Sequence, residues 1–202
     1  MTISYPLTMP TNPSIKSIRF TQKSIVASSR SQFTGGESRY LHQGGWLEAE
    51  ITLPHMRNEH ARDWIGFFAA LKGKYGSFWL QDPDYTRRGV GTGSPLVNGA
   101  NQTGYTLITD GWTNNITNIM RRGDYIQIGD FLYTVTADVN SDGSGNATLD
   151  IWPALRESPA DNAVITVNNP KGKFRLATNE SSWSTDQMKI FGITFACVED
   201  LS

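Results

Sequence analysis

Cysteine is almost missing from this sequence. Its 202 residues include a single one, Cys197. One cysteine excludes an intramolecular disulfide and a zinc site built from cysteine thiolates. Cys197 stands in the apolar run "ITFACVEDL", where we expect a small buried side chain rather than a nucleophile.

An excess of charge of one sign is also missing. Lysine and arginine number 18 and aspartate and glutamate 19, a formal net charge of −1, so nothing draws the whole chain toward nucleic acid or an anionic membrane. No apolar run approaches the length that spans a bilayer, and we expect no membrane insertion. The first twenty residues hold no apolar segment of the secretion-signal type, so we expect no such signal.

Recognisable catalytic motifs are absent as well. His55 and His60 are five residues apart across a predicted strand-to-helix junction, so they do not share a helical face as zinc ligands would, and His42 is remote in sequence. "GVGTGS" lacks the Lys-Ser/Thr end of a phosphate loop, and there is no Gly-x-Ser-x-Gly elbow. We expect no catalytic residue, no cofactor and no enzyme. A wall hydrolase that uses lone carboxylates stays open as an alternative.

Glycine, by contrast, is abundant, with 19 residues that fall between short apolar runs. This pattern is typical of a mainly β chain with many turns. In the first segment, "SIKSIRFTQKSIVAS" and "WLEAEITL" alternate as half-buried strands do. Between them, "SQFTGGESRYLHQGG" suggests a glycine-rich loop or an open hairpin.

One amphipathic helix is predicted at about 58–72. Asn58 is a good N-cap, acidic residues follow in the first turn, and Gly73 suits the C-terminal end. Apolar residues fall at helical spacing, and we expect this face to pack on a sheet: Ala61, Trp64, Ile65, Phe68 and Leu71.

A change of composition marks a second domain. "RRGVGTGSPLVNGANQTG" is nearly all turn formers, and five short strands then follow between Tyr105 and Val167, a spacing typical of a small barrel. The last strand-like run is too short for a domain and most plausibly pairs with the first segment. The predicted fold is therefore one mainly β domain (1–91 plus 176–202) interrupted by a second, small β-barrel domain (92–175).

The segment Asp138–Leu149, "DVNSDGSGNATL", begins like the calcium loop of an EF-hand. That loop needs a bidentate carboxylate at its twelfth position and helical flanks. Here the twelfth residue is Leu149 and the flanks alternate as strands. We therefore expect a hairpin connection rich in turn formers, with Asp138, Asn140 and Asp142 as weak candidates for an adventitious metal ion.

Three stretches resemble one family. They are "FTGGESRY…GGWLEAEITLP", "ARDWIGFFAALKGKYGSFWLQDPD" and "RRGDYIQIGDFLYTVTADVNSDGSGNATLDIWPALRESPADNAVITVNNPKGKFRLA". The chain is similar to tail-tip proteins of long-tailed bacteriophages and most resembles the distal tail protein family. The third stretch is the most specific, and it is of a kind that recurs in several phage tail proteins.

The resemblance implies a structural virion protein, made in the host cytoplasm and placed at the phage tail tip. It also implies that the first domain is a belt-like β barrel or sandwich and that the inserted domain is a small OB-like β barrel. It implies a homo-oligomeric ring, usually a hexamer, that joins the tail tube to the hub and lines the channel for ejected DNA. The implied partners are further copies of itself, the major tail tube protein, the hub protein and the tape measure protein. An alternative is a tail-tip module whose inserted barrel binds a host-surface glycan through Trp112 or Trp152.

Overall fold

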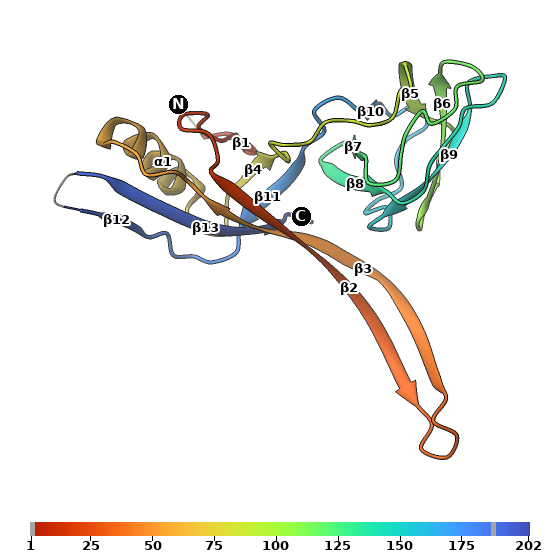
Figure 1. The fold of residues 1–202 in the computed structure, drawn as a ribbon, viewed down its shortest axis with the longest axis horizontal. Coiled ribbons are helices and arrows are strands. Elements are labelled where there is room, and N and C mark those ends of the chain that lie inside the picture. The colour runs from red at the N-terminus through yellow and green to blue at the C-terminus, as the bar shows by residue number, and fades with distance from the viewer. Residues whose placement is uncertain (1–2, 187–188) are drawn as a thin grey trace. The chain divides into compact units, whose positions relative to one another are not determined.

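The computed structural model describes residues 3–186 and 189–202. It confirms the predicted fold class: the chain is mainly β, with one helix in the described residues, a mixed sheet, and a nearly closed antiparallel sheet inserted in the sequence (Figure 1). The chain divides into two compact units. The base unit comprises residues 3–21, 47–85, 171–186 and 189–202, and the barrel unit comprises residues 22–46 and 86–170.

The base unit is built on the mixed sheet, whose strand order is β1-β4-β11-β13-β3-β2, with β12 paired to β13 off this path. β1 runs parallel to β4, while β11 is antiparallel to β4 and β13, and β13 is antiparallel to β3 and β12. Among the described residues β1, β2 and β12 each pair with one strand only, which leaves one backbone edge of each open. The strands are β1 (Leu7–Thr8), β2 (Ser17–Arg30), β3 (Glu37–Thr52), β4 (Ser77–Leu80), β11 (Gly172–Leu176), β12 (Trp183–Thr185) and β13 (Phe191–Glu199).

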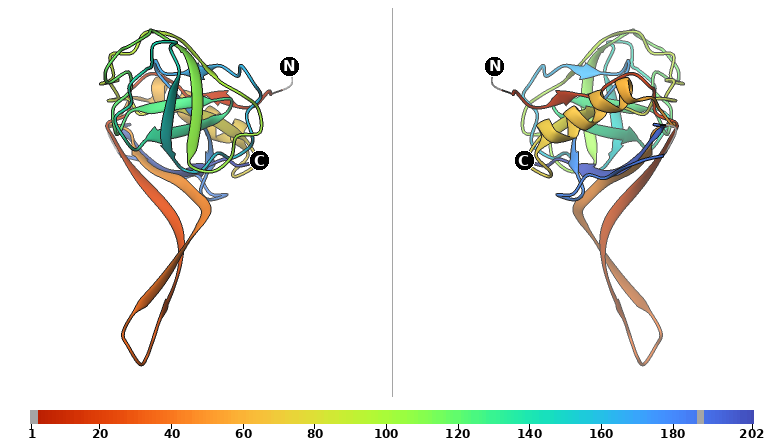
Figure 2. Two further views of the ribbon diagram at one scale, coloured as in Figure 1. Left: turned by 90° about the vertical axis from the view of Figure 1, so that its right-hand side faces the viewer. Right: turned by 90° about the vertical axis from the view of Figure 1, so that its left-hand side faces the viewer.

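Helix α1 (Asn58–Leu71) covers one face of this sheet (Figure 2, right). Its aromatic side chains meet those of the strands: the Phe67 ring lies 5.5 Å from that of Phe78 on β4, and the Trp64 ring 5.9 Å from that of Phe195 on β13. Such edge-on and tilted arrangements are the favoured geometries of aromatic pairs. This aromatic layer is the core of the base unit.

The predicted helical face is right at four positions and wrong at one. Ala61, Trp64, Phe68 and Leu71 are buried, but Ile65 is only half-buried, and Phe67 is buried in its place. Successive residues differ by 100° around a helix, so Ile65 falls at the flank of the stripe, whereas Phe67 faces β4.

The prediction that Asn58 caps this helix is also wrong. The N-cap residue is Arg57, which has an extended backbone and makes no capping bond with its side chain. Asn58 is the first helical residue, and its Oδ1 accepts a hydrogen bond from Nε of Arg62 at 3.1 Å. The helix ends as expected next to Gly73, although Lys72 already adopts the left-handed conformation.

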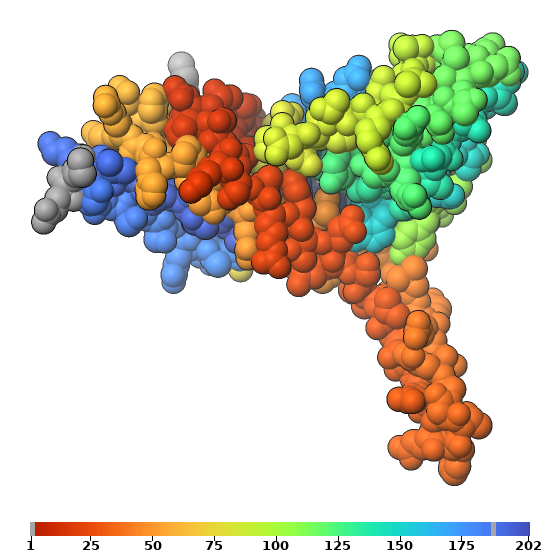
Figure 3. Space-filling model, in the orientation of Figure 1, coloured from red at the N-terminus to blue at the C-terminus, as the bar shows by residue number. Residues whose placement is uncertain are grey.

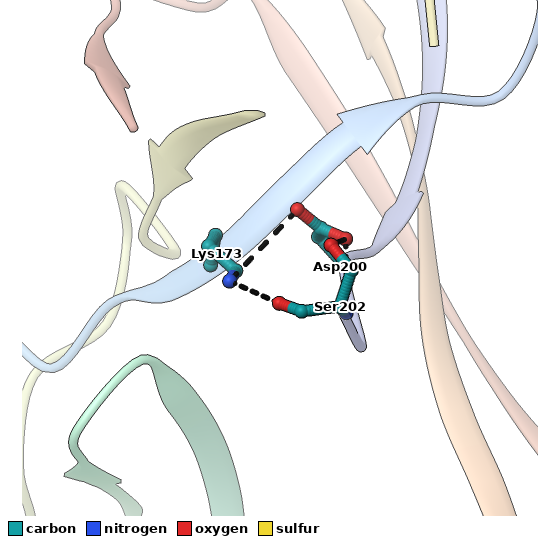
Figure 4. A network of polar contacts seen from close by, with 3 residues as sticks. All are labelled: Lys173, Asp200 and Ser202. Atoms are coloured by element: carbon teal, nitrogen blue, oxygen red, sulfur yellow. Dashed lines mark hydrogen bonds and ion pairs between the residues drawn. The ribbon is translucent and has the colours of Figure 1, made fainter. Parts of the chain in front are cut away.

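Polar contacts fix the end of β13 to β11 (Figure 4). The backbone N–H of Asp200 donates to the carbonyl of Lys173, and the Lys173 ammonium donates to the carbonyl of Ser202 at 2.6 Å. The ammonium also lies 4.0 Å from the carboxylate of Asp200, which is itself nearly buried. Nearby, the buried carboxylate of Glu199 accepts the backbone N–H of Leu47 at 3.1 Å. These contacts hold the centre of the sheet in register.

The barrel unit contains a six-stranded antiparallel sheet in the order β10-β7-β8-β9-β6-β5. The strands curl around one core (Figure 2, left), and the side chains of β9 alternate between buried and exposed, as period-2 alternation predicts. The sheet nearly closes, because a bridge joins Leu96 to Val164 and the Val97 N–H donates to the carbonyl of Ala163. The strands are β5 (Gly93–Val97), β6 (Thr106–Trp112), β7 (Tyr125–Ile128), β8 (Phe131–Val135), β9 (Ala147–Trp152) and β10 (Ile165–Thr166).

Two hairpin connections join β7 to β8 and β8 to β9. Gly129-Asp130 forms a two-residue turn between β7 and β8, with Gly129 at φ +57°, the conformation that a II′ hairpin requires at its first position. β8 pairs antiparallel with β9, so residues 136–146 are a hairpin connection, although a longer one than a tight turn.

The compact units divide the chain close to the predicted domain limits. The divisions fall after residues 85 and 170, where the sequence predicted them after 91 and 175. β11 belongs to the base unit, whose sheet it joins through β4 and β13. Residues 22–46 belong to the barrel unit, a feature with no counterpart in the predicted division.

We expect the substitution Phe67→Ala to lower the free energy of unfolding by about 3–5 kcal/mol, because it leaves a cavity between α1 and β4. The matched substitution Ile65→Ala should cost less than about half of this, because that side chain is only half-buried. Urea unfolding followed by tryptophan fluorescence measures both. Equal losses would contradict the observed helical face.

Candidate functional site

The most unusual feature of the chain is a two-stranded ribbon that no other described segment covers. Every residue from 22 to 44 is exposed. We call this segment the arm: it consists of the distal part of β2, a turn at residues 31–36, and the distal part of β3 (orange in Figures 1 and 3). An isolated two-stranded ribbon is marginally stable in water, so local contacts have to hold it.

The tip of the arm is held by a compact set of hydrogen bonds. The Ser31 N–H donates to the carbonyl of Gly36 at 2.8 Å, and the Gly35 N–H donates to the carbonyl of Ser31. The Ser31 hydroxyl accepts the N–H groups of Phe33 and Thr34. Gly35 has φ +71°, a conformation that glycine adopts without strain.

The root of the arm is fastened inside the barrel unit. A Cβ at Gly45 would lie 2.9 Å from the carbonyl oxygen of Lys23 and 3.3 Å from the ring of Trp152, so only glycine lets these segments approach. The Tyr105 hydroxyl donates to the carbonyl of His42 at 3.2 Å, and the Tyr40 and His42 rings meet edge to face. The sequence suggested a loop or an open hairpin here; the structure extends the strand through Gly44-Gly45.

The arm exposes large apolar side chains on both faces. Ile25 and Val26 are neighbours on β2, and Tyr40 and Leu41 are neighbours on β3; all four are exposed. Successive residues of a strand point to opposite faces, so each face of the ribbon carries apolar area. Phe33 at the tip is 99% exposed. These exposed apolar side chains make the arm a candidate interaction surface.

The segment that resembles a calcium loop uses its oxygens for another purpose. Oδ1 of Asp142 accepts the N–H groups of Ser144 and Asn146, each at 2.8 Å, and Oδ2 accepts the Asn146 side-chain amide. These bonds, the backbone bond from Asn146 first, hold the pKa of Asp142 below its usual value. The carboxylate therefore supports the turn at neutral pH, and this support is lost as the pH falls through the lowered pKa.

The other two metal candidates anchor the loop to the preceding segment. Asp138 accepts the N–H of Arg122 at 2.9 Å, and Asn140 accepts the N–H of Asn118 at 2.7 Å. Leu149, at the twelfth position, is fully buried in the barrel core. Within residues 3–186 and 189–202 no group of three or more histidine, cysteine, aspartate or glutamate side chains is placed to hold a metal ion.

The two glycan candidates differ in position. Trp112 is 4% exposed, and its indole N–H donates to the hydroxyl of Thr109 at 2.8 Å, so its ring is part of the core and offers no face to a sugar. The prediction that Trp112 could bind a glycan is therefore wrong. Trp152 is half-buried and packs against Gly45 at the root of the arm.

Cys197 lies in the core, as predicted. Its side chain is 1% exposed, and burial raises its pKa to about 12. The thiolate, which is the nucleophilic form, is therefore not accessible at neutral pH.

Asp124 is a buried carboxylate that the sequence did not single out. Its oxygens accept the backbone N–H groups of Arg88, Gly89 and Arg121 at 2.8–2.9 Å. This residue fastens the segment that enters the barrel to the turn before β7. These three bonds give Asp124 a structural role, because they satisfy backbone N–H groups of two irregular segments.

The base unit also has a hollow of about 360 Å³. Met9, Pro10, Ile15 and Trp79 supply apolar walls, and the ammonium of Lys171 lies 4.7 Å from the centre of the Trp79 ring. The Lys171 ammonium therefore covers one face of Trp79, the aromatic ring that lines the hollow. In the described part of the chain no helix is long and apolar enough to cross a bilayer.

We expect calcium not to be a structural ligand of Asp138–Leu149, because amide groups already occupy the side-chain oxygens. The thermal unfolding midpoints of the full chain in excess calcium and in chelator should coincide. A shift of many degrees, which tight binding to the native state alone produces, would contradict the hydrogen-bonded loop.

Comparisons with known proteins do not identify the family of this chain, so the family remains a prediction from the sequence. No protein-family model and no curated protein sequence matches it. The resemblance to phage tail-tip proteins therefore rests on the sequence stretches quoted above. The arm and the open sheet edges are independent observations, and they carry the functional proposal.

Proposed function

We propose that the chain is a structural protein of a long-tailed phage tail tip, which forms a homo-oligomeric ring between the tail tube and the hub. The ring would line the channel through which DNA leaves. The partners would be further copies of the chain, the major tail tube protein, the hub protein and the tape measure protein. The observation that carries this proposal is the uncovered arm, residues 22–44.

The open edges of the base sheet support the same proposal. β2 and β12 each pair with a single strand in the described residues. Open edges attract further strands, and a soluble monomer blunts them with charge, proline or short strands. β2 is long, and its distal half carries Ile25 and Val26 exposed. Edges of this kind suit a protein whose working form is an assembly.

The number of uncovered residues fits an interface of ordinary size. Stable protein interfaces use about 20–30 residues on each side, and the arm alone exposes residues 22–44. Glycan binding by the inserted barrel receives less support, because Trp112 is in the core.

The position of the protein in the virion tests the proposed function. We expect antibodies raised against the chain to label the distal end of the tail tube in electron micrographs. Image reconstruction of that region should show a ring of identical copies. A single copy, or a label on the tail fibres or the capsid, would overturn the assignment.

Deletions separate the contribution of the barrel strands from that of the arm. We expect replacement of residues 86–170 by a short linker to weaken ring formation without abolishing it, because the open edges remain while the root of the arm loses Tyr105 and Trp152. Replacement of residues 22–44 by a two-residue turn should abolish it. Native mass spectrometry of the purified variants measures both results, and the opposite pattern would place the ring contacts in the barrel.

A further inference from the structure

We propose that the hollow in the base unit binds an extended segment of another tail protein, which inserts one large apolar side chain and sets a carboxylate two residues away against Lys171. This inference rests on the proposed function, because it names the chemistry of a partner in the tail. The hollow shares no residue with the arm.

The hollow has the dimensions of a binding pocket. Its volume of about 360 Å³ lies in the range of ligand pockets, about 300–1,000 Å³. Its lining comes from three parts of the base unit that are distant in sequence, within residues 8–15, within residues 79–83 and at Lys171. Met9 and Ile15 are among its apolar walls, which favour the burial of an apolar group.

Lys171 sets the charge of the occupant. Its ammonium lies 4.7 Å from the centre of the Trp79 ring, and both residues line the hollow. An ammonium carries three N–H donors, so it can take an acceptor from a partner in addition to its contacts within the chain. None of the described residues that line the hollow is acidic. A carboxylate of the occupant would therefore meet a cation and no like charge from the lining.

The open edge of β1 favours an extended occupant. Within the described residues β1 pairs with β4 alone, and Thr8, its last residue, lines the hollow. A segment that adds to such an edge gains backbone hydrogen bonds, and its alternate side chains enter neighbouring pockets. Residues i and i+2 of an extended segment lie on the same face, about 6–7 Å apart. We therefore expect one residue between the apolar and the acidic side chain.

This chain offers no such segment of its own in the described residues. Among the exposed large apolar residues, only Ile108 and Leu201 have an acidic residue two positions away. Ile108 and Asp110 lie on β6, which is paired on both edges and cannot add to β1. The acidic neighbour of Leu201 is Glu199, which is buried and accepts the N–H of Leu47. The occupant therefore comes from a different protein.

Two matched peptides with amidated C-termini test the predicted spacing on the full chain. Fluorescein-labelled Ser-Thr-Phe-Thr-Asp-Thr-Ser should bind at least about tenfold more tightly than Ser-Thr-Phe-Thr-Asn-Thr-Ser, which lacks only the carboxylate, because a charge-assisted hydrogen bond is lost. A peptide with alanine in place of phenylalanine should bind at least about tenfold more weakly as well. Fluorescence anisotropy over a concentration series measures the affinities.

Charge exchange tests the role of Lys171. The variant Lys171→Glu should bind the aspartate peptide at least about tenfold more weakly than the natural chain does. It should bind a peptide with lysine in place of aspartate more tightly than the natural chain does, since the charges are exchanged. The control Lys74→Glu makes the same change at an exposed position outside the hollow and should bind as the natural chain does. Circular dichroism confirms that each variant is folded.

Several outcomes would overturn the proposal. They are equal affinities for the aspartate and asparagine peptides, equal losses in Lys171→Glu and Lys74→Glu, and no binding of any peptide at millimolar concentration. If the acidic polysaccharide polygalacturonate bound where the peptides did not, the hollow would be a glycan site. If no peptide bound and Lys171→Glu alone weakened self-association, the hollow would be a contact between copies.

The position of the protein in the virion separates failure of this inference from failure of the proposed function. A tail-tip ring whose chain does not distinguish the peptides would refute the binding site and leave the function standing. Selective binding of the aspartate peptide by a protein that lies outside the tail tip would refute the function and leave the peptide site standing.

Discussion

Backbone groups at the edges of β-sheets need partners, and this requirement governs how the two units of the chain differ. The barrel unit meets it internally, because hydrogen bonds between Val97 and residues 162–163 nearly close the sheet. The base sheet has no such closure among the described residues: β2 and β12 are left open on opposite sides of β13. A closed sheet satisfies its own backbone groups, whereas an open edge offers them to further strands. The proposed function uses this difference: the insert is self-contained, and the base unit would supply the contacts of the proposed ring.

The arm, which extends the open sheet, gains no stability from a hydrophobic core. Its side chains contribute nothing to a core, since residues 22–44 are exposed throughout. Its conformation is instead set at two points, the hydrogen-bonded tip at Ser31 and the close approach of Gly45 to Trp152 at the root. A ribbon that is preorganised at both ends loses little entropy on docking, which favours affinity. The apolar side chains between these points are then available to a partner.

Sequence periodicity predicts most of the fold and little of this surface. Strand alternation located the barrel strands, and the spacing of Trp64, Phe68 and Leu71 located the helix, because burial on one face imposes a period. The arm was predicted only in part. Residues 14–28 alternate as a half-buried strand does, and residues 31–45 were expected to be a loop or an open hairpin, but in the structure residues 22–44 are exposed on both faces. Gly44-Gly45 continues the strand at the close approach of Trp152, which the sequence does not reveal. Asp124 was not predicted, because two of its three backbone donors, Arg88 and Gly89, lie 36 and 35 residues away in the sequence.

Several carboxylates of this chain have a structural role in the described residues. Asp124, Asp138, Asp142 and Glu199 each accept backbone N–H groups, and Asp200 binds the end of the chain to Lys173. A carboxylate accepts such bonds more strongly than a neutral oxygen, so it is an efficient anchor for irregular segments. Carboxylates engaged in this way fasten irregular segments to their neighbours. The exposed apolar side chains Ile25, Val26, Tyr40 and Leu41 lie instead on the arm, where no such anchor is needed and where a partner can reach them.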